Sequence, residues 1–216
     1  MGQFSYSHCS TIFHFPFSIL CVRRYHSPTM DLVFLGIQGS GKGTQARRLA
    51  DEFGYYVFDM GYELRAIAGS GTELGNTVKS YIDEGHLVPA DIIMKVVREA
   101  LEQHKKKHIL FDGIPRDMDQ KREFDAIMKE LKRTFRCINI LLPYEEAFQR
   151  IKGRASVEGR ADDADDEKIR RRMSLFKEKT MPVVEKYIQE EKLVQVDGSG
   201  SMDEVYELIK QILLKT

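Results

Sequence analysis

A glycine-rich loop between an apolar run and a helical run constrains this chain more than any other feature. The loop reads Gly36-Ile37-Gln38-Gly39-Ser40-Gly41-Lys42-Gly43-Thr44-Gln45. It follows the apolar residues 32–35 and opens a helix expected over 42–53, which Gly54 ends. Backbone N–H groups, a helix N-terminus and a lysine together favour a bound phosphate. The loop therefore predicts a phosphate-binding site at the end of the first strand.

Four more short apolar runs follow, separated by segments with helical spacing. We expect strands at 55–58, 108–111, 137–142 and 193–196, and most of them end at or close to a glycine, aspartate or proline. Strands that alternate with helices predict an α/β fold, with a parallel five-stranded sheet covered by helices on both faces. Ligands of such sheets bind at the carboxyl ends of the strands.

Composition excludes several classes of partner. The 216 residues include 33 basic and 33 acidic side chains, so the chain is neutral and has no global field that attracts nucleic acid or membrane. We expect neither as a partner. Cys9, Cys21 and Cys137 match no disulfide framework and no metal-ligand spacing. This pattern predicts a reducing, cytoplasmic location and no structural metal.

Residues 1–29 differ from the rest of the sequence. They contain no acidic side chain, and their adjacent arginines, Arg23 and Arg24, follow the apolar stretch, whereas a signal peptide has its charge before it. The apolar stretch is too short to span a bilayer. Two readings stay open, an organelle transit peptide and an unstructured extension upstream of a true start at Met30. We favour the extension.

Four motifs, in this order, resemble those of adenylate kinases and related nucleoside monophosphate kinases. The first is the loop, in which Gly43 separates Lys42 from the hydroxyl of Thr44. The resemblance covers residues 30–216 and implies a P-loop NTPase-like fold. The other three motifs are Asp112-Gly113-Ile114-Pro115-Arg116 with Gln120, then Arg150 to Arg154 followed by Gly159-Arg160-Ala161-Asp162-Asp163, and Arg170-Arg171-Arg172-Met173.

The resemblance also implies roles for single residues. It implies Mg²⁺ bound with ATP near Asp112, and no structural zinc. The catalytic residues it implies are Lys42, Arg116, Arg154, Arg160 and Arg172. The implied ATP-binding residues are Gly39, Ser40, Gly41, Lys42, Gly43, Thr44, Arg150, Arg154 and Gly200. The implied AMP-binding residues are Met60, Arg65, His86, Leu87, Val88, Gly113, Ile114, Pro115, Arg116, Gln120, Arg160 and Arg172.

Two inserts are expected within the domain, a monophosphate-binding insert at about 59–88 and a short lid at about 154–162. The first insert departs from the family pattern, since Met60 lacks the usual hydroxyl and Tyr62 replaces an acid. These departures leave the base preference open. The spacing from Arg160 to Arg172 is one residue longer than in the family, so either Arg171 or Arg172 is the phosphate ligand after the lid.

The expected reaction is ATP + AMP ⇌ 2 ADP, carried out by a monomer. The first alternative is a uridylate/cytidylate or other nucleoside monophosphate kinase with the same fold. Gln120 favours the adenylate reading, because an amide of that length can pair with the adenine edge. The second alternative is a protein that binds nucleotide without catalysis. Lys42, Arg116, Arg154 and Arg160 argue against it, because a binding protein has little use for charge around a transferring phosphoryl group.

Overall fold

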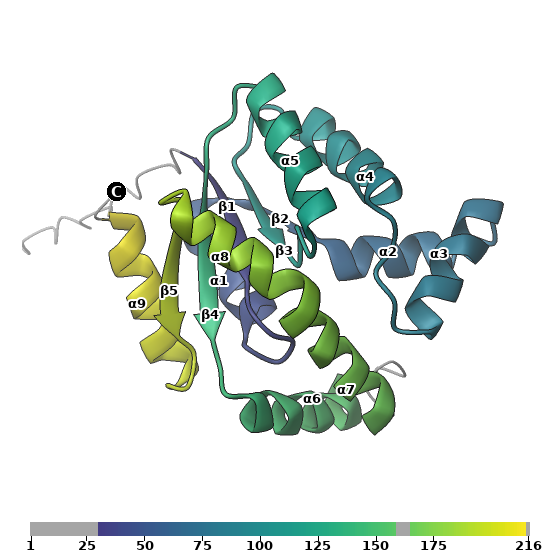
Figure 1. Cartoon of the computed structure of the whole chain (residues 1–216). Coiled ribbons are helices and arrows are strands. Elements are labelled where there is room, and N and C mark those ends of the chain that lie inside the picture. The colour runs from purple at the N-terminus through teal and green to yellow at the C-terminus, as the bar shows by residue number, and fades with distance from the viewer. Residues whose placement is uncertain (1–29, 159–164, 215–216) are drawn as a thin grey trace, which may run out of the picture.

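The computed structural model describes residues 30–158 and 165–214, and its centre is one parallel sheet. The predictions made for residues 1–29 and for Arg160 lie outside these residues. The strand order is β2-β3-β1-β4-β5, and every neighbouring pair is parallel (Figure 1), which confirms the predicted fold class. The strands are β1 (Asp31–Leu35), β2 (Tyr56–Asp59), β3 (Ile109–Asp112), β4 (Phe135–Leu141) and β5 (Leu193–Asp197).

Side chains of β1 alternate between two apolar cores, one on each face of the sheet. Leu32 and Phe34 pack with Leu49 and Ile209, which come from α1 (Lys42–Phe53) and α9 (Met202–Leu214). Val33 and Leu35 of β1 pack into the larger core on the opposite face. That core includes side chains of α4 (Ala90–Gln103), α5 (Met118–Glu130) and α8 (Met181–Gln189). A strand buried on both faces explains why residues 32–35 are apolar without interruption.

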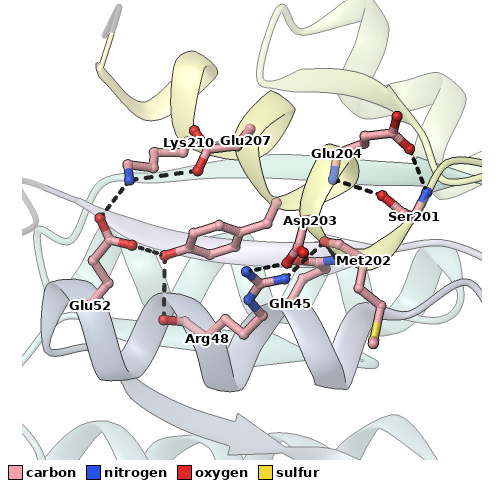
Figure 2. Close-up of polar contacts among 10 residues, drawn as sticks. Gln45, Arg48, Glu52, Ser201, Met202, Asp203, Glu204, Glu207 and Lys210 are labelled. Carbon is pink, nitrogen blue, oxygen red and sulfur yellow. Dashed lines mark hydrogen bonds and ion pairs between the residues drawn. The ribbon is translucent and has the colours of Figure 1, made fainter.

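Helix α1 is fixed to α9 by polar contacts (Figure 2). The Gln45 side-chain amide and the Arg48 guanidinium both donate to the Met202 carbonyl, each at 3.0 Å. Glu52 accepts from the Tyr206 hydroxyl and pairs with the Lys210 ammonium at 2.7 Å. These contacts hold the helix that begins at Lys42 in a fixed position relative to the end of β5.

Two pairs of helices extend from the carboxyl side of the sheet (Figure 1). Helices α2 (Met60–Ala68) and α3 (Glu73–Asp83) occupy the predicted insert at 59–88, and Asp59 and Thr72 cap their N-termini with side-chain oxygens. Helices α6 (Tyr144–Glu158) and α7 (Asp166–Leu175) flank the predicted lid. Residues 154–158 continue α6, and 159–162 lie outside the described residues. A π-helix, η2 (Phe176–Thr180), joins α7 to α8.

Within residues 30–158 and 165–214, no helix combines the length and the apolarity that crossing a bilayer requires.

Candidate functional site

A cavity of about 440 Å³ lies at the carboxyl ends of the strands, where the glycine loop meets both pairs of helices. Its walls come from the loop, from α2 and the segment before α4, from the end of β3, and from α6, α7 and η2. The position is the one that a parallel sheet of this kind predicts for a ligand. The cavity is lined by both apolar side chains and charged groups, chiefly arginines.

The glycine loop can take its shape only because three of its glycines, Gly36, Gly39 and Gly41, adopt positive φ. Gly39 has φ 84°, and a Cβ there would lie 2.8 Å from the Ala147 carbonyl oxygen. Gly41 has φ 92° and is the N-cap of α1. A side chain at Gly39 would be both strained and blocked by backbone, so glycine is required. The chain then enters α1 with its first N–H groups available for an anion.

Lys42 is half-buried beside the loop. Its ammonium donates to the Gly36 carbonyl at 2.8 Å and to the Ile37 carbonyl at 2.9 Å. Burial lowers the pKa of Lys42 to about 8, an effect that nearby Asp112 opposes and Arg116 reinforces. A lysine with this pKa is still mostly protonated at neutral pH, but it loses its charge at a lower pH than an exposed lysine does. A polyanionic ligand in the cavity would stabilise the charged form.

Asp112 ends β3 and is largely buried, with 9% of its surface exposed. Burial raises the pKa of its carboxyl, and Asp59 raises it further, while Lys42 acts in the opposite direction. Asp59 and Asp112 are register partners, so two carboxylate residues lie side by side at the carboxyl ends of β2 and β3. A pair of carboxylates in a buried setting favours a cation between or beside them.

Arg116 is held at both its backbone and its side chain. Its N–H donates to Gln120 Oε1 at 2.8 Å, and its Nε donates to the Gly113 carbonyl at 2.6 Å. Burial lowers the pKa of Arg116, and the charge of Arg172 lowers it further. Both arginines line the cavity and bring two positive charges to it. Such an arrangement suits an anion with several negative oxygens.

Arg171 and Arg172, the two candidates for the phosphate ligand after the predicted lid, lie in different surroundings. Arg172 lines the cavity, whereas Arg171 does not. The Arg171 guanidinium contacts the Nε2 atom of His86, and the other ring nitrogen of His86 lies 3.0 Å from Glu84. Arg171 therefore contacts the segment before α4, and of the two arginines only Arg172 lines the cavity.

Most of the residues predicted from the sequence line this one cavity, but three do not. Ser40 is 2% exposed and does not reach it, and Ile114 is fully buried in the core. Gly200 lines a separate hollow beside Glu204 and Leu208. Arg160 lies outside the described residues. The predicted residues that line the cavity are Gly39, Gly41, Lys42, Gly43, Thr44, Met60, Arg65, His86, Leu87, Val88, Asp112, Gly113, Pro115, Arg116, Gln120, Arg150, Arg154 and Arg172.

Sequence reasoning missed four charged residues that line the cavity, Arg47, Asp59, Asp83 and Lys168. Arg47 follows Gly43 by one helical turn, and a Cβ at Gly43 would lie 3.6 Å from its guanidinium. The i, i+4 spacing was a usable signal for Arg47. Asp59 ends β2 as Asp112 ends β3, which was a second signal. Lys168 lies on α7 after the predicted lid, and nothing in the local sequence distinguishes it from a surface lysine.

Within the described residues, no group of three or more His, Cys, Asp or Glu side chains could hold a metal ion. A divalent cation brought in with a nucleotide is a different case, because phosphate oxygens complete its shell. The buried Asp112 carboxylate and the Thr44 hydroxyl supply oxygen ligands of the kind that Mg²⁺ prefers, and both line the cavity. The residues present therefore fit Mg²⁺ bound with ATP.

A parallel sheet, a glycine loop that opens a helix, and a cavity lined by arginines define a phosphate-loop nucleotide-binding protein. A sequence model of the adenylate kinase family matches residues 34–192. The chain belongs to the adenylate kinase family, whose members are ATP-dependent phosphotransferases.

Several relatives align with nearly their whole length. The adenylate kinase of Thermus thermophilus is 40% identical over 183 residues, which cover 84% of this chain and 96% of the relative. That of Deinococcus deserti is 38% identical, with 82% and 93% covered. That of Archaeoglobus fulgidus is 33% identical over 214 residues, with 86% and 99% covered. All three carry the same name, and none favours the uridylate/cytidylate alternative.

Proposed function

We propose that this protein transfers a phosphoryl group reversibly from ATP to AMP, giving two ADP. The observation that carries the proposal is the convergence of the glycine loop, Lys42 and Arg116 on one cavity at the strand ends. Membership in the adenylate kinase family supports the same reaction. We assign the triphosphate to the loop side of the cavity and the monophosphate to the side formed by α2 and the segment 86–88.

Phosphoryl transfer asks the protein to position two nucleotides and to stabilise charge, with little covalent chemistry of its own. Lys42 and the N–H groups at the start of α1 would hold the β- and γ-phosphates. Arg116 and Arg172 line the same cavity and would hold the monophosphate oxygens. Arg150 and Arg154 on α6 line the same cavity and would contact the transferring region. Fixed cations aimed at that region stabilise charge without reorganisation.

Mg²⁺, when bound with ATP, supplies charge neutralisation across the β- and γ-oxygens. Asp112 and Thr44 would hold it, directly or through its waters. A cation beside Asp112 also keeps the carboxyl ionised against the effect of burial, which raises its pKa.

The base of the monophosphate would lie against an apolar wall. Met60, Leu64, Val88 and Ile93 line the cavity and are each less than a tenth exposed. Gln120 lies beside this wall, where its Nε2 is 3.5 Å from the Val88 carbonyl oxygen. An amide has two N–H donors and an oxygen with two lone pairs, so it can pair with an adenine edge while keeping its backbone contacts. Met60 contributes only apolar contact, as the sequence indicated.

We infer that 59–88 is the monophosphate-binding insert and that about 154–162 forms a short lid, which would exclude water and so prevent hydrolysis of ATP. The cysteine pattern supports a cytoplasmic protein. The balanced charge supports the expectation of no nucleic-acid or membrane partner, and we propose separately that the protein is a monomer.

A kinetic comparison of acceptors tests the proposed function. The full chain is assayed with ATP and Mg²⁺ against AMP, CMP, UMP and GMP, and nucleoside diphosphate formation is measured. We expect the highest kcat/KM with AMP. A higher value with CMP or UMP would replace the adenylate assignment by the pyrimidine one. Nucleotide binding without transfer to any acceptor would instead support the non-catalytic alternative.

A further inference from the structure

The junction between α7 and α8 contains a π-helical turn whose cause lies in the sequence. The Met181 N–H bonds to the Phe176 carbonyl, five residues back, and η2 ends at Thr180. Pro182 follows directly and has no N–H to donate. In a regular α-helix its ring would clash with the carbonyl of the fourth residue before it. One wider turn ahead of Pro182 relieves that clash and lets the helix continue as α8.

The π turn changes which side chains share a face of the helix. Arg172 and Thr180 are eight residues apart, so at about 100° per residue they would lie about 80° apart on a regular α-helix. A π turn accommodates one extra residue, which removes about one step of 100° and leaves the two within about 20° of each other. Both residues line the cavity. Single π turns of this kind occur often at functional sites.

Thr180 uses this placement to contact Arg116. Its Oγ1 donates to the Arg116 carbonyl at 2.7 Å, and Thr180 is 6% exposed. The Arg116 N–H is held by Gln120 and its Nε by Gly113, so Thr180 provides the third tether. Gln120 and Gly113 belong to the same segment as Arg116, whereas Thr180 is 64 residues away. Thr180 is the one of the three that fixes Arg116 relative to the helix bearing Arg172.

We propose that Thr180 is a positioning residue for Arg116, set in register with Arg172 by the π turn before Pro182. The proposal rests on the proposed function, because it concerns the arginines that would hold the monophosphate. Arg116 and Arg172 carry like charges and line one cavity, so the distance between them depends on how each is held. The Thr180 hydroxyl connects the backbone of the first to the helix of the second. A small displacement of a charged group near a transferring phosphoryl group carries a large kinetic cost.

The experiment compares Thr180→Val with Thr180→Ser in the full chain. Valine keeps the shape and loses the hydroxyl, and serine keeps the hydroxyl. We expect Thr180→Val to lower kcat/KM for AMP by about tenfold and to leave the KM for ATP near the wild-type value. Thr180→Ser should recover most of the loss. A kinetic profile equal to wild type for Thr180→Val, or equal losses for both variants, would overturn the proposal.

Two controls separate positioning from general destabilisation. Thr77→Val removes an exposed hydroxyl that donates to the Glu73 carbonyl at 3.0 Å, and it should leave all kinetic constants unchanged. In an Arg116→Ala background, Thr180→Val should change kcat/KM less than about twofold, because Thr180 acts through Arg116. A further loss of about tenfold in that background would refute positioning. Failure of the proposed function is distinguishable, since the wild type itself would then transfer no phosphoryl group to AMP.

Discussion

At the scale of single residues, the proposed role of Lys42 requires a protonated ammonium, although burial disfavours its charged form. Burial lowers its pKa to about 8, so in the free protein the ammonium loses its proton as pH rises through that value. The parameter kcat/KM reports the ionisation of free enzyme, whereas kcat reports that of the bound complex. Phosphates beside Lys42 would stabilise the ammonium and raise its pKa. The two parameters should therefore depend differently on alkaline pH.

We expect kcat/KM for ATP to fall as pH rises above about 8 and kcat to persist to higher pH. Steady-state kinetics between about pH 6 and pH 10 measure both, where these limits span roughly two units either side of the pKa. Lys42→Ala serves as the control. It should lower kcat by about 10²- to 10³-fold, since one charged donor to the transition state is lost, and its residual activity should not show the alkaline fall. A wild-type kcat/KM that stays level to the upper end of this range would contradict this account of Lys42.

At the scale of elements, β1 has a buried acid at the end opposite the site. The Asp31 side chain is 1% exposed and accepts from the Ile109 N–H at 2.8 Å and from Arg133 Nη2 at 2.6 Å. Arg133 Nε adds a second bond to the same carboxylate at 2.7 Å. Asp31 thereby connects β1, β3 and the turn before β4. Breaking a buried pair on one side leaves the other charge without compensation.

Asp31→Asn should therefore lower the free energy of unfolding by about 3 kcal/mol. Activity at low temperature should be retained, because Asp31 lies at the amino end of β1 and the cavity lies beyond its carboxyl end. Urea unfolding measures the stability, and the acceptor assay measures the activity. Glu130→Gln is the matched control, since it breaks an exposed bidentate pair with Arg98 and should change stability little. Equal effects of the two variants would show that Asp31 has no special structural role.

The strands were predictable because each is a short apolar run between residues that end strands. The strand boundary, the helices and the turn that the sequence did not predict have physical causes. The fourth strand begins at Phe135 and not at Cys137, because Phe135 pairs with Asp31 on β1, a contact that local sequence does not encode. The helices within the insert were not assigned from the sequence. The π turn was also missed, since Pro182 requires some adjustment of the helix but does not specify which.

The candidate site was predictable to the extent that motifs specify it. The loop, the segment around Arg116 and the arginine after the lid all reach one cavity, as their resemblance to the family implied. Ile114 shows the limit of that inference, because a residue inside a binding motif can be the one that faces the core. Arg47 and Thr180 show the opposite limit. Both lie outside the motifs. Arg47 reaches the cavity because it lies one helical turn after Gly43, and Thr180 bonds to the Arg116 carbonyl, 64 residues away in the sequence.

At the scale of the whole molecule, all described strands and all cavity-lining residues come after residue 29. β1 begins at Asp31, the family match begins at residue 34, and every cavity-lining residue follows. A fragment of residues 30–216 should therefore keep the kcat/KM of the full chain and a Tm within about 2 °C of it. Acceptor assays and thermal unfolding on the two proteins measure this. A fragment of residues 36–216 is the control, because it lacks the central strand, which is buried on both faces, and it should not fold. If the 30–216 fragment lost activity or melted markedly earlier, residues 1–29 would have to be counted as part of the domain.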